Sequence, residues 1–184
     1  SYIIQKFYSQ QLTITSCSKC DYYTVNFEPF MVLSLEIPDP NSNLYDCLSS
    51  YTNKTTLDAD NLWTCDKCKQ KVNPDKKIKL WKTSNVIIIL LKRYSNRSKK
   101  DNFVEYPLKL DLDDYLVDYE KKGKTYSLSG ICIQSGSLGG GHYYAMCQNA
   151  LDGKWREYND TNVREVDEKE LLCQKPYCLF YRRS

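Results

Sequence analysis

The sequence has no long apolar segment, and none of its apolar runs approaches the roughly 18 consecutive residues of a membrane-spanning helix. Its first residues, Ser1–Lys6, show no basic leader followed by an apolar stretch, so a secretion signal is not expected. A strong charge of one sign is also lacking, because 26 basic residues face 23 acidic ones and leave a net charge of +3. That balance argues against a general nucleic-acid-binding protein.

Glycine and proline are scarce as well, and the seven glycines and six prolines fall between apolar runs instead of collecting in a linker. No internal repeat is present. The 184 residues are enough for one sizeable domain, and we expect one continuous body over residues 1–184. Sixteen tyrosines against five phenylalanines and the run Val86–Leu91 favour β-structure. The prediction is an α+β fold dominated by strands.

Several elements follow from the apolar periodicity. Asn43 can cap a helix over Leu44–Tyr51, and the near-continuous apolar run Asn85–Tyr94 is expected to be a central strand buried on both faces. The polar stretches Ser95–Asn102 and Ser135–Gly141 are expected to be exposed, flexible loops. Further strands are expected at residues 7–15, 22–35, 126–134, 143–148, 155–159 and 177–182, with the first two forming a hairpin tipped by cysteines.

Nine cysteines are present, and an odd number excludes complete pairing in internal disulfides. Without a secretion signal we expect a reducing compartment, in the cytoplasm and/or the nucleus. Four of the cysteines form two Cys-x-x-Cys motifs, Cys17–Cys20 and Cys65–Cys68. Two such motifs can complete a tetrahedral site with Zn–S bonds of about 2.3 Å, and four protein sulfurs leave no open position for water. We therefore predict one structural Zn²⁺, with four ordinary thiols or two local disulfides as the alternatives.

The other cysteines lie in apolar or helical sequence, and we expect them in the core. They are Cys47, Cys132, Cys147, Cys173 and Cys178.

Lysines flank the second cysteine motif and raise the alternative of a zinc ribbon that binds nucleic acid. Asp58, Asp60, Asp66 and Asp75 interrupt this positive charge, so a solvated basic face is the preferred interpretation.

The chain has a single histidine, His142, which sits where the glycine-rich stretch Gly139–Gly141 enters a predicted strand. An imidazole at such a place can reach a substrate and act as a general base. Downstream, Asn159 and Asp160 supply an amide and a carboxylate, and either could accept a hydrogen bond from the imidazole, as in Cys-His-Asn proteases.

Taken together and in this order, these motifs resemble the catalytic domain of the ubiquitin-specific proteases, which has thumb, palm and fingers parts. The matching stretches are Phe7–Cys20, Trp63–Cys68, Leu80–Tyr94, Gly139–Met146, Trp155–Asp160 and Tyr177–Arg182. The resemblance implies a papain-like fold with zinc-ribbon fingers at about residues 7–80 and a palm at about residues 81–184. It also implies binding of ubiquitin or ubiquitinated proteins. Gln134 departs from the family, which often has histidine there.

Carried over residue by residue, the resemblance makes His142 the general base, Asn159 its orienting partner and Asp160 an auxiliary carboxylate. Cys17, Cys20, Cys65 and Cys68 become the fingertip zinc ligands. The stretches at residues 95–102 and 135–141 would border the channel for the C-terminal tail of ubiquitin.

The family's nucleophilic cysteine motif and the thumb that carries it do not occur in these residues, so the chain alone is expected not to cleave isopeptide bonds. Three explanations stay open: a part of a longer protease, one half of a split enzyme that a partner completes, and a non-catalytic ubiquitin-binding module. The presence of both His142 and Asn159 favours the first two, because a binding module has no chemical need for that pair.

Overall fold

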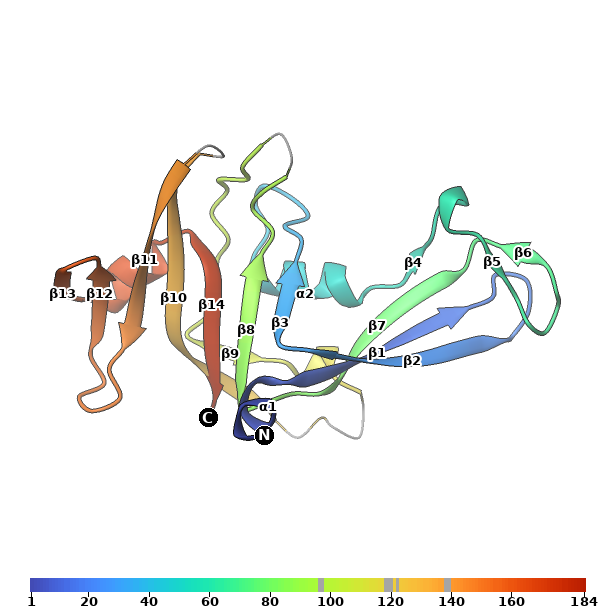
Figure 1. The fold of residues 1–184 in the computed structure, drawn as a ribbon, viewed down its shortest axis with the longest axis horizontal. Coiled ribbons are helices and arrows are strands. Elements are labelled where there is room, and N and C mark those ends of the chain that lie inside the picture. The colour runs from blue at the N-terminus through green and yellow to red at the C-terminus, as the bar shows by residue number, and fades with distance from the viewer. Residues whose placement is uncertain (96–97, 118–120, 122, 138–139) are drawn as a thin grey trace.

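The structure, a computed structural model, describes residues 1–95, 98–117, 121, 123–137 and 140–184. A broad sheet forms one end of the molecule, and a narrow sheet extends away from it to a tip at the other end (Figure 1). None of the helices among these residues is both long and apolar enough to cross a membrane. The expectation of a strand-dominated α+β fold is confirmed.

The broad sheet has eight strands in the order β13-β12-β11-β10-β14-β8-β3, with β9 pairing to β10. Only β3 and β8 run parallel, and every other pair is antiparallel. The strands are β3 (Val32–Leu35), β8 (Val86–Leu91), β9 (Lys109–Asp111), β10 (Thr125–Ser137), β11 (Gly140–Gln148), β12 (Trp155–Asn159), β13 (Asn162–Val166) and β14 (Pro176–Arg183).

The main core lies on one face of this sheet. Ile87, Ile89 and Leu91 of β8 are buried there, whereas the residues between them are only half-buried. Helix α2 (Leu44–Thr52) packs into the same core. Asn43 caps this helix through a reciprocal pair of hydrogen bonds with Asp46, so the predicted helix and its cap are confirmed.

The narrow sheet has the order β2-β1-β7-β4, and β5 and β6 form a small ribbon at its tip. Its first two strands form the predicted hairpin, closed by the pair Ser16 and Tyr23 beside the first cysteine motif. The strands are β1 (Ser9–Ser16), β2 (Tyr23–Phe30), β4 (Thr55–Thr56), β5 (Trp63–Thr64), β6 (Lys71–Val72) and β7 (Asp75–Lys82).

Short helices complete the fold. They are α1 (Tyr2–Phe7), α3 (Glu168–Leu172) and the 3₁₀ turns η1 (Ala59–Asn61) and η2 (Asp113–Tyr115).

Two predictions need correction. The strand at residues 85–94 is not central, because β8 lies next to the edge strand β3, and only one of its faces is fully buried. The stretch at residues 135–141 is not a loop in its described part, because Ser135–Ser137 pair with Gly140–His142 and extend the β10–β11 hairpin. Residues 96–97 and 138–139, which belong to the two predicted loops, lie outside the described residues.

Candidate active site and metal centre

The four motif cysteines meet at the tip of the narrow sheet. Their sulfur atoms all lie within 4.8 Å of one another, with 3.8 Å from Cys17 Sγ to Cys68 Sγ and 3.7 Å from Cys20 Sγ to Cys65 Sγ. A tetrahedron with metal–sulfur bonds of about 2.3 Å has edges of about 3.8 Å, so the spacing fits one metal ion bound by four thiolates. The residues present therefore form a cluster that could hold a metal.

Local backbone geometry builds this cluster from two tight turns. In the second motif Lys69 adopts a positive φ of 57° and its N–H donates to the Cys65 carbonyl, which turns the chain back toward the cluster. Cys17 and Cys65 are buried together with Val72 in a small core. Tyr22 and Trp63 pack against this core and stack on each other. This small core is separate from the main core of the broad sheet.

The predicted base and its orienting amide meet at the opposite end of the molecule. His142 Nε2 lies 2.6 Å from Asn159 Oδ1, and Asp160 Oδ2 lies 3.9 Å from the same nitrogen. An amide oxygen can only accept, so Nε2 carries the proton and Nδ1 is left as an acceptor. The ring is half-exposed and lies nearly parallel to that of Tyr144, with 6.5 Å between centroids. A general base needs this tautomer when its unprotonated Nδ1 faces the group whose proton it removes.

Strand register brings these side chains together. Ala145 of β11 pairs with Tyr158 of β12, so His142 and Asn159 project from the same face of neighbouring strands near the end of the sheet. Asp160 follows in the tight turn between β12 and β13 and has a positive φ of 52°. The structure therefore brings the three predicted site residues together, and their catalytic roles stay a prediction.

Glycine is required on the hairpin that carries His142. Gly136 has a φ of +114°, and a Cβ atom there would lie 2.6 Å from the Gly140 carbonyl oxygen. A Cβ atom at Gly141 would lie 2.0 Å from Gln134 Nε2 and 2.5 Å from the Ser135 carbonyl oxygen. These close approaches keep the β10 and β11 backbones together next to the pair formed by Ser135 and His142.

None of the nine cysteines, all of which are described, makes a hydrogen bond to His142. Cys147 and Cys132 lie on the opposite face of the β10–β11 hairpin, because they occupy alternate register positions. Burial raises the pKa of the Cys47 thiol to about 11 and that of the Cys178 thiol to about 11, which makes both poor nucleophiles.

The prediction that all five remaining cysteines are core residues holds fully only for Cys47. Cys132, Cys147 and Cys178 are half-buried, and Cys173, at the end of α3, is exposed.

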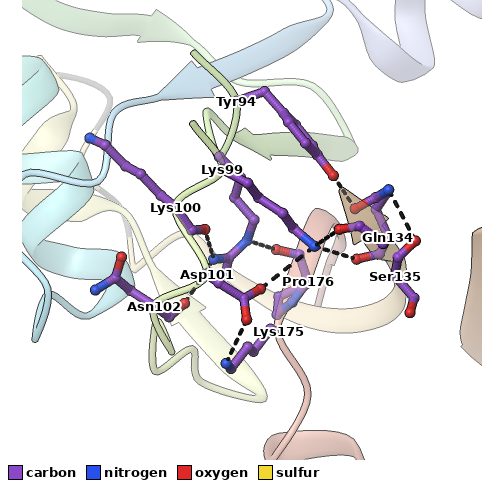
Figure 2. A network of polar contacts seen from close by, with 11 residues as sticks. Tyr94, Lys99, Lys100, Asp101, Asn102, Gln134, Ser135, Lys175 and Pro176 are labelled. Atoms are coloured by element: carbon purple, nitrogen blue, oxygen red, sulfur yellow. Dashed lines mark hydrogen bonds and ion pairs between the residues drawn. The ribbon is translucent and has the colours of Figure 1, made fainter. Parts of the chain in front are cut away.

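Sequence reasoning missed two cations close to the histidine hairpin, Arg93 and Lys99. Both belong to the segment after β8 and contact backbone carbonyls of β10, β14 or their own segment. Figure 2 shows Lys99 beside the end of β10. The available signal was Arg93 itself, an arginine two residues after Leu91, the last residue of β8. A cation in that position must either leave the core or find partners inside it.

Comparisons with known proteins identify the family of the chain. A family model described as ubiquitin carboxyl-terminal hydrolase matches residues 1–181. A probable ubiquitin carboxyl-terminal hydrolase of Acanthamoeba polyphaga mimivirus is 38% identical over 196 residues, covering 100% of this chain and 42% of that protein. Ubiquitin carboxyl-terminal hydrolase 3 of Homo sapiens is 35% identical over 188 residues, covering 90% of this chain and 36% of that protein.

Among solved structures, a chain of the SAGA Ubp8/Sgf11/Sus1/Sgf73 DUB module bound to ubiquitin aldehyde superimposes with a TM-score of 0.88 at 28% identity. That match covers 100% of this chain and 43% of the other. The chain thus spans less than half the length of each of these proteins.

Proposed function

The chain belongs to the ubiquitin carboxyl-terminal hydrolase family, and from that membership we propose that it supplies the base and the metal-braced fingers of a cysteine-type deubiquitinase. The observation that carries the proposal is the 2.6 Å contact between His142 Nε2 and Asn159 Oδ1. The resemblance drawn from the ordered sequence motifs is confirmed by the family match.

In the proposed reaction, His142 Nδ1 takes the proton of a cysteine thiol. The thiolate attacks the carbonyl carbon of the C-terminal glycine of ubiquitin, and the imidazolium returns the proton to the leaving amine. Water then hydrolyses the thioester, with His142 again acting as base. Asn159 holds the ring in its tautomer, and the Asp160 carboxylate lies 3.9 Å from the same ring nitrogen.

The attacking thiol is proposed to come from outside residues 1–184, either from another part of a longer protein or from a partner chain. Four cysteines gather at the metal cluster, and the other five make no hydrogen bond to His142. We therefore expect the 184 residues alone to bind ubiquitin without cleaving it. Titration calorimetry with ubiquitin checks the first half of this statement, and no heat at high micromolar concentration would contradict it.

The metal is proposed to be one Zn²⁺ held by Cys17, Cys20, Cys65 and Cys68. Sulfur donors and the tetrahedral spacing suit zinc, and with all four positions filled by protein its role would be structural. Metal analysis of the purified protein should find about one zinc per chain. A zinc content near zero together with four free thiols would reject this assignment.

The catalytic proposal is tested on the full-length protein that contains this chain, with a fluorogenic amide of ubiquitin as substrate. His142→Gln should lower kcat/KM at least about a hundredfold, the size expected for losing a general base. Asn162→Ala serves as the matched control, because Asn162 is an exposed asparagine across the turn, whereas the hydrogen bond to His142 is made by Asn159. If the His142→Gln protein kept activity within about twofold of the wild type, the assignment of the base would be wrong.

A further inference from the structure

Arg93 is a buried cation that ties three backbone segments together. Its side chain is 2% exposed, Nε donates to the Pro176 carbonyl at 2.7 Å, and Nη1 donates to the carbonyls of Lys100 at 3.0 Å and Asn102 at 2.7 Å. A guanidinium taken out of water must recover its hydrogen bonds inside the protein. The segment at residues 99–102 is therefore held firmly against the start of β14.

This anchored segment presents Lys99 to the end of β10. The Lys99 side chain is 16% exposed, and Nζ donates to the carbonyl of Gly136 at 2.9 Å and to that of Gln134 at 3.3 Å. Those two carbonyls flank Ser135, and Ser135 is the register partner of His142 on β11. Figure 2 shows the Lys99 side chain reaching across to Gln134.

The Lys99 ammonium group lies beside the end of β10, where β14 no longer pairs with that strand. Pairing between β10 and β14 ends at Ile133 and Pro176, whereas pairing between β10 and β11 continues to Ser137 and Gly140. Beyond Ile133 the end of β10 therefore has a strand on one side only. Lys99 donates to the carbonyls of Gln134 and Gly136, which lie beyond Ile133. It therefore replaces hydrogen bonds that β14 does not provide to this part of β10.

A second contact leads from the same segment to the neighbour of His142. The Tyr94 hydroxyl donates to Gln134 Oε1, and Gln134 Nε2 donates to the Ser135 carbonyl at 3.1 Å. The Gln134 amide fills the space beside Gly141. The Gln134 side chain is thus held between Tyr94 and the residue before the histidine.

We propose that Lys99 is a positioning residue for His142. By capping the carbonyls of Gln134 and Gly136, it fixes the free end of the β10–β11 hairpin and with it the ring that Asn159 must meet. This inference rests on the proposed function, since it concerns the base of that reaction. Lys99 acts through the backbone of β10 and contacts neither the imidazole nor the site of the reacting atoms.

Lys175 provides the matched control. It lies on the other side of Asp101, with Nζ at 3.2 Å from Oδ2, while Lys99 Nζ lies 3.6 Å from Oδ1. Replacing either lysine by methionine removes one positive charge beside the same carboxylate. Only the replacement of Lys99 removes donors from the carbonyls of β10.

The test uses the fact that His142 is the only histidine, so imidazole ¹⁵N signals of the labelled 184-residue chain belong to one ring. At about pH 8.5 the wild type should show the tautomer protonated on Nε2, the one in which Nε2–H donates to Asn159 Oδ1. Lys99→Met should shift the ratio of tautomers toward Nδ1–H by about fivefold, the equivalent of weakening one hydrogen bond. Lys175→Met should leave the ratio unchanged.

A folded Lys99→Met protein with the wild-type ratio would overturn the proposal, as would an equal shift in Lys175→Met. If Lys99→Met does not fold, Lys99→Gln replaces it; its shorter amide can donate to only one of the two carbonyls, so the ratio should shift in the same direction by a smaller factor. An unchanged ratio in that variant would overturn the proposal equally. The measurement needs no hydrolysis, so failure to cleave ubiquitin would count against the proposed function and leave the role of Lys99 intact.

Discussion

At the scale of single residues, the β10–β11 hairpin that carries His142 depends on the absence of a side chain at Gly141. Gly141 leaves room for the Gln134 amide and for the Ser135 carbonyl oxygen, which would lie 2.5 Å from an added Cβ atom. The amide could rotate away, but the carbonyl belongs to the paired backbone of β10 and cannot. The hairpin therefore tolerates no β-carbon at this position without moving the strand that carries His142.

Gly141→Ala is accordingly expected to lower the free energy of unfolding by about 1–3 kcal/mol, the range for forcing an extra carbon into a packed site. Gly140→Ala is the matched control, because nothing lies within 4 Å of a Cβ atom there. Urea unfolding of both variants measures the difference. Equal stabilities of the two variants would show that the strand end accommodates the methyl group.

At the scale of elements, the β1–β2 hairpin contains Glu28, whose side chain stabilises the fold in its ionised form. Glu28 accepts hydrogen bonds from Gln11 at 2.8 Å and from Thr13 at 3.3 Å, and the Gln11 bond is the main reason why the pKa of Glu28 lies below its usual value. A lowered pKa in the folded state means that the ionised form stabilises the fold.

This stabilisation should be complete above about pH 4.3, the usual pKa of glutamate in an unfolded chain, and should fade as the pH falls through the lower folded-state pKa. The difference in free energy of unfolding between the wild type and Glu28→Gln should therefore stay constant from about pH 6 down to about pH 4.3 and shrink below it toward about pH 3. Denaturant titrations over this range provide the measurement. A difference that stays constant with pH would mean that the Glu28 charge does not contribute.

Elements were predictable where one local signal decided them. Asn43 with Asp46 defines the start of α2, and the predicted strand Trp155–Asn159 coincides with β12 to the residue. The predicted strand at Phe7 begins instead at Ser9, because Ser1 caps a helical turn through Phe7. Lys99 and the hairpin end beside it could not be predicted, because their contacts join residues far apart in the sequence and depend on where β14 stops.

At the scale of the whole molecule, two cores of unequal size lie at opposite ends. The main core fills one face of the broad sheet, and the small core at the tip is built largely from the cysteines themselves. So little apolar surface cannot hold the tip without help, which makes the proposed zinc the main source of its stability. The two ends should therefore differ in their response to metal removal.

Cys65→Ser, or treatment with a chelator, should raise amide hydrogen exchange at residues 17–22 and 63–72 by about a hundredfold or more. Amides of β10 and β14 should keep their protection, because their core contains no cluster cysteine. Cys173→Ser is the control, since that cysteine is exposed and lies outside the cluster. Loss of protection throughout the broad sheet would show that the two cores fold as one unit.

The narrow sheet enters the broad sheet through two continuous strands. β2 passes into β3 with only Met31 between them, β7 passes into β8 through Thr83–Asn85, and β3 and β8 then lie side by side (Figure 1). Ser9 of β1 is fastened to the second junction by its hydroxyl contact with Ser84 at 3.0 Å. The narrow sheet is thus joined to the broad sheet by two covalent connections. A protein that binds the tip and displaces it therefore acts on β8 through β7. β8 pairs with β14 and β14 pairs with β10, so the displacement reaches the β10–β11 hairpin that carries His142.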